Sequence, residues 1–175
     1  MVVRIASKIC IVYYSRTGNT EYIVGIIRRA LNDAGIEVDT YRVQPVREYS
    51  KPLHLNPRVL FDTLMRGGTT TMFDPGEPAI EQCSAVIAAS PIWMGTLAPP
   101  VQEFLRKYTA SVRHLIVVTT SVLAASCSKI KRRVEKLRGA EPALCVNIDG
   151  SMIRDRTKVD SILSSVIGRL KDILR

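Results

Sequence analysis

Short apolar segments alternate with longer amphipathic segments along almost the whole chain. The short segments are rich in Val, Ile and Ala, a composition typical of strands buried in a parallel sheet. The longer segments place apolar residues at intervals of three and four, the spacing of a helix that packs on a sheet with one face. The alternation therefore predicts βαβ units around a parallel sheet.

The pattern assigns most of the chain to strands and helices. The expected strands are Lys8–Tyr14, Ile36–Val43, Ala85–Ala89, Leu115–Thr120 and Ala143–Ile148. The expected helices are Asn19–Ala34, Pro57–Arg66, Pro99–Tyr108, Ser128–Arg138 and Thr157–Leu174. By composition, the segments between them that read as loops include Thr69–Pro78 and Ser90–Leu97. Right-handed crossovers would give a three-layer, doubly wound α/β sandwich, and periodicity alone leaves two five-stranded orders open.

The length and composition fit one globular domain. The chain has 175 residues, 46% hydrophobic and 23% charged, so residues 1–175 are expected to form a single domain. No apolar run approaches the ~18 residues of a membrane span. The segment Met1–Ala6 is too weakly apolar for a secretory signal, so we expect a cytoplasmic protein. No exposed apolar helix face indicates an obligate dimer, and the oligomeric state stays open.

The four cysteines lack both a C-x-x-C pair and the spacing of zinc ligands. Two of them lie in apolar runs, where cysteine behaves as a small hydrophobic residue. Because disulfides are unusual in the cytosol, we expect reduced structural thiols and no metal site. The residues concerned are Cys10, Cys83, Cys127 and Cys145.

The segment Ser15–Thr20 joins the first expected strand directly to the first expected helix, with hydroxyls at positions 15, 17 and 20. Hydroxyls and the N–H groups of a helix N-terminus are donors that suit a phosphate, and the helix dipole favours its charge. A plain capped turn is the alternative, but a cap needs only one hydroxyl. The P-loop and dinucleotide glycine patterns are missing, so we predict a single-phosphate site, with Arg16 balancing the charge.

The ten residues Ile11–Thr20 (IVYYSRTGNT) resemble the signature of the flavodoxin family, although Val24 stands where that family often has Ala. In flavodoxins this hydroxyl loop holds the 5′-phosphate of FMN. The resemblance implies FMN as the cofactor and the strand order 2-1-3-4-5, with FMN at the switch point between strands one and three; flavodoxin is itself a type example of that arrangement. It assigns phosphate binding to Ser15, Arg16, Thr17, Gly18, Asn19 and Thr20.

A second stretch, Ser90–Leu105, resembles the loop and helix that follow the third strand in flavodoxins. In those proteins the loop runs along the isoalloxazine edge, and an aromatic residue stacks on the ring. Trp93 is the only tryptophan and holds that position here, with a large apolar face to offer. A tryptophan that only fills the core is the alternative. The resemblance implies cofactor contacts from Ser90, Pro91, Ile92, Trp93, Met94 and Gly95.

The segment Thr119–Cys127, after the fourth expected strand, departs from the family. Related flavodoxins and quinone reductases carry glycines or acidic and aromatic residues here, whereas this segment is small and apolar. Thr120 and Ser121 remain candidates for hydrogen bonds to the flavin. Because nearby charges and hydrogen bonds tune a flavin, the departure leaves the redox potential open.

The chain is basic, with a net charge of +9, whereas many flavodoxins that shuttle electrons are acidic. Basic residues concentrate on the expected helix Ser128–Arg138. They form either the solvated face of an amphipathic helix or a docking surface for an acidic partner or an anionic substrate. No nucleic-acid motif accompanies the charge, so we expect no nucleic-acid partner.

These features favour an FMN flavoprotein that transfers electrons between redox partner proteins, with no side chain acting as a catalytic acid or base. Two alternatives stay open. One is an NAD(P)H-dependent quinone or FMN oxidoreductase on the same fold, although no nicotinamide site is evident. The other is a flavodoxin-like interaction domain without a cofactor. His54 and His114 lie outside the segments assigned to the flavin, and we expect both to be structural or surface residues.

Overall fold

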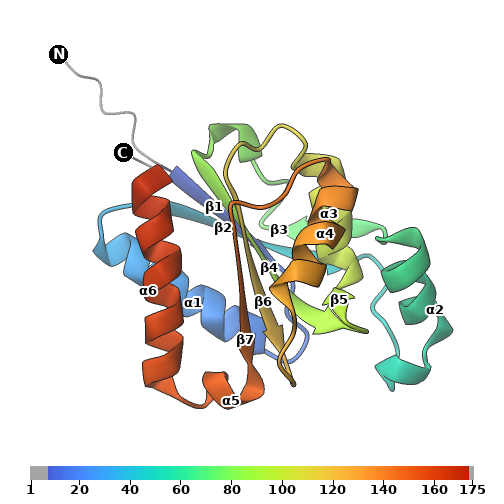
Figure 1. Cartoon of the computed structure of the whole chain (residues 1–175). Helices are drawn as coiled ribbons and strands as arrows, with labels where there is room; N and C mark the ends of the chain where they lie inside the picture. The colour runs from blue at the N-terminus through green and yellow to red at the C-terminus, as the bar shows by residue number, and fades with distance from the viewer. Residues whose placement is uncertain (1–7, 174–175) are drawn as a thin grey trace.

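The computed structural model describes residues 8–173. The expectations that rest on Met1–Ala6 and on Leu174 lie outside this range. The centre of the fold is a sheet with the strand order β3-β2-β1-β4-β6-β7, and a short strand, β5, pairs with β4 (Figure 1). The strands are β1 (Lys8–Tyr13), β2 (Glu37–Pro45), β3 (Thr71–Asp74), β4 (Ala85–Trp93), β5 (Thr96–Leu97), β6 (Leu115–Ser121) and β7 (Leu144–Asp149).

The five parallel strands confirm the expected order. Along the sheet they run β2-β1-β4-β6-β7, which is 2-1-3-4-5 in the order of the five expected strands. The fold is therefore the flavodoxin-like α/β sandwich. The chain reverses direction across the sheet between β1 and β4, so this pair of strands marks the switch point.

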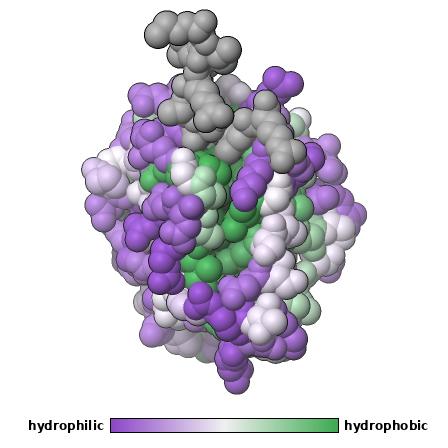
Figure 2. All heavy atoms as spheres, turned by 90° about the vertical axis from the view of Figure 1, so that its left-hand side faces the viewer, coloured by the Kyte–Doolittle hydropathy of each residue, from purple (hydrophilic) through white to green (hydrophobic). Residues whose placement is uncertain are grey.

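Helices cover both faces of the sheet (Figure 1). Alternate residues of β1 explain the two cores: Ile9 and Ile11 pack with α1 (Asn19–Asp33) and α6 (Arg156–Ile173). Cys10 and Val12 pack on the other side with α3 (Pro99–Tyr108) and α4 (Cys127–Arg138). Figure 2 views the side that carries α1 and α6 and shows hydrophobic residues in a hollow between more polar ridges. No helix within residues 8–173 is long and apolar enough to cross a membrane.

Two segments expected to be loops contain strands. Within Thr69–Pro78, β3 pairs antiparallel with the second half of β2, and its Phe73 packs edge-on against Phe104 and Tyr108. Within Ser90–Leu97, β4 continues to Trp93: β6 pairs with it as far as Pro91, and β5 folds back to pair with Ile92 and Trp93. The turn between β4 and β5 uses positive φ angles at Met94 (49°) and Gly95 (78°).

The expected helix Pro57–Arg66 is present, but it has two parts. It begins as α2 (Pro57–Leu60), where the Asn56 side chain accepts hydrogen bonds from the N–H groups of Arg58 and Val59. It continues as a π-helical segment, η2 (Phe61–Arg66), that ends at Gly67 with a φ of 67°. Three short helices were not expected: η1 (Leu53–Leu55), η3 (Ile80–Gln82) and α5 (Gly150–Ile153).

The structure contradicts the expectation of reduced thiols. Cys10 is bonded to Cys83 and Cys127 to Cys145, with Cα–Cα distances of 5.7 and 5.8 Å. The first pair lies 73 residues apart in sequence. The two residues meet because β1 and β4 are neighbours in the sheet and Cys83 lies two residues before the start of β4. The second pair fastens the first turn of α4 to β7.

The pairing predicts how the thiols react. Protein unfolded without a reductant should show no reactive thiol, and protein unfolded after reduction should show four, as measured by titration with a thiol reagent. The double variant Cys127→Ala, Cys145→Ala removes a bridge that spans 18 residues. It should lower the free energy of unfolding by about 3 kcal/mol, because the unfolded chain loses a constraint. Four reactive thiols before reduction would contradict both disulfides.

Candidate functional site

The loops that follow β1, β4 and β6 meet at the carboxyl edge of the sheet, beside the switch point. Together they line a pocket of about 270 Å³. Open α/β sheets bind ligands at this edge, because the strand reversal separates the neighbouring loops there. The residues singled out from the sequence that line this pocket are Arg16, Thr17, Asn19, Thr20, Pro91, Ile92, Trp93, Thr120 and Ser121.

The first loop leaves the start of α1 open. Gly18 is the N-cap residue, with a left-handed backbone (φ 92°) that suits glycine, and it offers the first turn no side-chain hydrogen bond. The Ser15 hydroxyl is buried and accepts a hydrogen bond from the Gly18 N–H at 3.2 Å, which shapes the turn. Thr17 and Asn19 are exposed at the pocket. Within the described residues, the exposed donors of this turn are thus left to solvent or to a ligand.

A buried hydroxyl pair connects the start of α1, which follows the first loop, to the end of β6, which precedes the third loop. The Oγ1 atoms of Thr20 and Thr120 lie 2.7 Å apart, and both side chains are almost fully buried. Thr20 belongs to the first turn of α1, and Thr120 belongs to β6 on the far side of β4. The hydrogen bond therefore holds two walls of the pocket at a set separation.

Arg16 has partners within the protein. Its Nη1 lies 2.9 Å from the Glu48 carboxylate, and its Nη2 donates to the Tyr49 carbonyl at 2.7 Å. The same carboxylate accepts a hydrogen bond from the Tyr14 hydroxyl at 3.1 Å. Arg16 lines the pocket and also ties the first loop to the segment after β2, so its positive charge is shared with Glu48.

Trp93 is half-buried between the edges of two tyrosine rings. Its ring centroid lies 5.5 Å from that of Tyr14 and 5.7 Å from that of Tyr49, each in a T-shaped arrangement. The Tyr49 hydroxyl donates to Asp62 at 2.7 Å. Burial raises the pKa of both tyrosines, and the neighbouring Glu48 raises the pKa of Tyr14 further. Both phenols therefore stay protonated at neutral pH. The contacts with the two tyrosine rings hold the indole of Trp93 in one plane.

Other predicted residues lie behind or beside this pocket. Ser90 is fully buried: its hydroxyl donates to the Pro91 carbonyl and accepts from the Ala98 N–H, which braces the turn between β4 and β5. Met94 lines a neighbouring pocket of about 220 Å³ that shares Trp93 with the first. Gly95 lines a third pocket of about 500 Å³.

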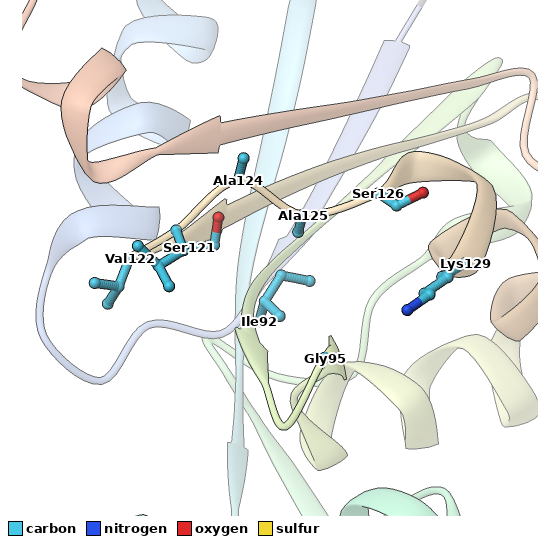
Figure 3. A pocket seen from close by; sticks show the side chains of 9 residues that line it. Ile92, Gly95, Ser121, Val122, Ala124, Ala125, Ser126 and Lys129 are labelled. Carbon is cyan, nitrogen blue, oxygen red and sulfur yellow. The ribbon is translucent and has the colours of Figure 1, made fainter.

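The third loop forms one wall of that larger pocket (Figure 3). Val122 and Leu123 are 88% and 79% exposed, so the small apolar loop presents bare hydrophobic side chains to solvent. Ser121 donates to the Asn147 side chain at 3.1 Å and keeps its lone pairs available. Lys129 of α4 points into the pocket in Figure 3.

The basic helix α4 is only partly a solvated face. Arg133 donates to the Gln102 side chain and to the Thr63 carbonyl, and burial lowers its pKa. Arg138 donates to backbone carbonyls, including that of Thr109 at 3.1 Å. These two arginines hold α4 against neighbouring segments, while Lys129 is the basic residue of this helix that reaches the pocket region.

The segment after β2 contributes to the site in a way that the sequence did not indicate. Leu53 lines the pocket of the three loops, and His54 lines the adjoining pocket with Trp93 and Met94. Tyr49 supports the indole from the same segment. The prolines of this segment indicate an irregular path but not its direction, so only the position of Tyr49 beside Trp93 reveals that the segment folds over the site.

Comparison with solved structures places the fold among flavoproteins. A flavoprotein from Lactobacillus acidophilus, solved in complex with FMN, has a TM-score of 0.68 and 17% identity, over 89% of this chain and 98% of that one. A flavodoxin from the domain Archaea has a TM-score of 0.58 and 10% identity, over 96% and 99%. Rubredoxin oxygen:oxidoreductase from Desulfovibrio gigas has a TM-score of 0.53 and 16% identity, over 95% of this chain and 37% of that one.

The sequence comparisons found no relatives: no protein-family model and no curated protein matches the chain. At such low identities, the structural likeness shows a shared fold.

The hydroxyl pair gives a prediction about stability. Thr20→Val or Thr120→Val alone leaves one buried hydroxyl without its partner and should lower the free energy of unfolding by about 1–3 kcal/mol. The double variant removes both hydroxyls at nearly constant volume and should recover part of that loss. Urea denaturation of all four proteins measures the coupling. Purely additive losses would show that the two hydroxyls do not interact.

Proposed function

We propose that this protein binds FMN at the carboxyl edge of the sheet and carries electrons between redox partner proteins. The observation that carries the proposal is the convergence, in one pocket, of an open helix N-terminus with exposed hydroxyl and amide groups and a tryptophan held in a set plane. FMN supplies the redox chemistry when bound. The FMN complex of the Lactobacillus acidophilus flavoprotein, which has the same fold, supports this choice of ligand.

The first loop suits the phosphate of FMN. Thr17 and Asn19 stand at the pocket with polar side chains exposed, and the N–H groups of the first turn of α1 add donors and a favourable dipole. Arg16 contributes positive charge, reduced by its pairing with Glu48. The donor set matches a dianion that needs several hydrogen bonds, so the residues present fit the phosphate group.

The second and third loops suit the flavin ring. The Trp93 indole is a large flat surface, and Ile92 and Val122 line the same pocket with apolar groups. Thr120 and Ser121 place hydroxyl oxygens at the pocket wall. Because Tyr14 and Tyr49 hold the indole, little conformational entropy is lost when a ring stacks on it.

The lining of the pocket suits a flavin that transfers electrons without a catalytic acid or base. Among its described lining residues there is no carboxylate or imidazole. Among residues 8–173, no group of histidine, cysteine and acidic side chains could hold a metal ion. The protein would then bind, orient and partly shield the flavin, and the redox partner would supply or accept the electrons.

Phosphate recognition can be tested with two ligands. Thr17→Ala should weaken FMN binding at least about tenfold, because a hydrogen bond to a charged group is worth about 1.5 kcal/mol or more. Riboflavin lacks the phosphate, so its affinity should stay the same in the variant. Quenching of the emission of Trp93, the only tryptophan, reports both titrations. Equal weakening of FMN and riboflavin, or none, would argue against phosphate binding by this loop.

Electron transfer without a nicotinamide site predicts a second result. FMN-loaded protein mixed with NADPH or NADH in the absence of oxygen should stay yellow, while dithionite should bleach it. The flavin absorbance measures the rate in each case. Rapid bleaching by either nicotinamide would instead identify an NAD(P)H-dependent oxidoreductase, and failure to retain FMN would leave a cofactor-free interaction domain.

A further inference from the structure

The helical segment Pro57–Arg66 exposes most of its large apolar side chains and buries two polar ones. Its buried residues include Asp62 and Thr63, whereas Phe61 and Met65 are 56% and 76% exposed. Leu60 and Leu64 share the exposed face, and Leu55 precedes it at 72% exposure. The expectation of no exposed apolar helix face is therefore wrong. We call Leu55, Leu60, Phe61, Leu64 and Met65 the apolar ridge.

Hydrogen bonds fix this orientation. The buried Asp62 carboxylate accepts from the Tyr49 hydroxyl at 2.7 Å and lies 3.4 Å from Nε of Arg58. The Thr63 carbonyl accepts from the side chains of Gln102 and Arg133, each at 3.0 Å. Rotating the helix to bury its apolar side chains would break these hydrogen bonds and leave the Asp62 carboxylate buried without a partner. The ridge therefore stays exposed to solvent.

The flanks of the ridge are basic. Arg47, Lys51 and Arg66 are exposed and have no ion-pair partner among residues 8–173. The two carboxylates between positions 46 and 66 are both engaged: Glu48 pairs with Arg16, and Asp62 is buried beside Tyr49. The surface therefore combines large bare apolar side chains with uncompensated positive charge.

We propose that the apolar ridge and its basic flank dock the protein on an anionic lipid surface. Leu and Phe side chains with neighbouring Lys and Arg are the composition of a helix that lies in a membrane interface. Figure 1 shows α2 standing out at the side of the molecule, where it can meet a surface without obstruction from the sheet. The proposal does not depend on FMN, because the ridge is formed by the protein alone.

Two other occupants fit the observations less well. A second copy related by a two-fold axis would bring two copies of the same basic flank into one interface, where their charges repel. A protein partner would need polar groups to pair, since interfaces carry about one hydrogen bond per 100–200 Å². The five side chains of the ridge carry no oxygen or nitrogen, and a lipid interior requires none.

Lipid docking would place the membrane near the candidate site. Leu53 and His54 come from the same segment as the ridge and line the pockets beside Trp93. A bilayer on the ridge would therefore lie close to the ring-binding part of the site. Electron partners held at the membrane would be the ones within reach.

Vesicle binding tests the proposal. The unmodified protein should co-sediment with vesicles in which half of the phosphatidylcholine is replaced by phosphatidylglycerol, and much less with pure phosphatidylcholine. Phe61→Ser with Met65→Ser should weaken binding at least about tenfold, because two large apolar side chains leave the lipid. Lys51→Glu with Arg66→Glu should weaken it by at least about fivefold for each charge. Circular dichroism checks that each variant folds.

Matched control variants distinguish binding by the ridge from non-specific binding of lipid by other exposed apolar or basic residues. Tyr22→Ser removes a 43% exposed aromatic side chain of α1, and Arg132→Glu with Lys136→Glu reverses exposed charges on α4. The apolar control should retain full binding to anionic vesicles. The charge control should lose less vesicle affinity than Lys51→Glu with Arg66→Glu. Absence of binding to anionic vesicles, or equal loss in the controls, would overturn the proposal. The proposal would also be overturned if the protein bound no vesicles and sedimentation equilibrium showed a dimer that Phe61→Ser with Met65→Ser dissociates. Riboflavin and FMN titrations of the same variants report the cofactor site separately.

Discussion

The reversal of strand order between β1 and β4 is the constraint on which the candidate site depends. Both strands are buried on both faces, so their register is set by the core, and the loops after them must part at the carboxyl edge. The hydroxyl pair of Thr20 and Thr120 then spans the gap, and Arg16 connects the first loop to the segment after β2. The site is thus positioned by contacts between loops that follow different strands, rather than by any one loop alone.

Much of the fold could be predicted because the core dictates local patterns. Four of the five parallel strands are short apolar runs, β2 alternates between polar and apolar residues, and α6 shows its buried stripe of Val159, Leu163, Val166 and Leu170 at helical spacing. The strand β3 could not be predicted, because it is short and lies among threonines and prolines. Its alternation becomes clear only from the packing of Phe73 on α3. Disulfide pairing depends on which strands become neighbours, which no single cysteine reveals.

The residues of the candidate site that the sequence singles out lie in short runs of consecutive residues at the ends of three parallel strands. In the first of these runs, the residues from Arg16 to Thr20 line the pocket or support it. Tyr49 and His54 could not be placed in the same way, because their positions follow from a buried contact between Tyr49 and Asp62. The same contact explains why Leu60, Phe61, Leu64 and Met65 face solvent while Val59 is buried: a hydrogen-bonded carboxylate decides the orientation of the helix.

The short strand β3 also affects whether a strand of another molecule can pair with the edge of the sheet. Without it, β2 would form the rim of the sheet over its whole length and could template the addition of a foreign strand. β3 pairs with Arg42 to Pro45, and Pro75 directly after it has no N–H to extend the ladder. The uncovered first half of β2 carries Glu37 and Asp39, which pair with Lys8. This edge of the sheet is therefore poorly suited to the addition of a further strand from another molecule.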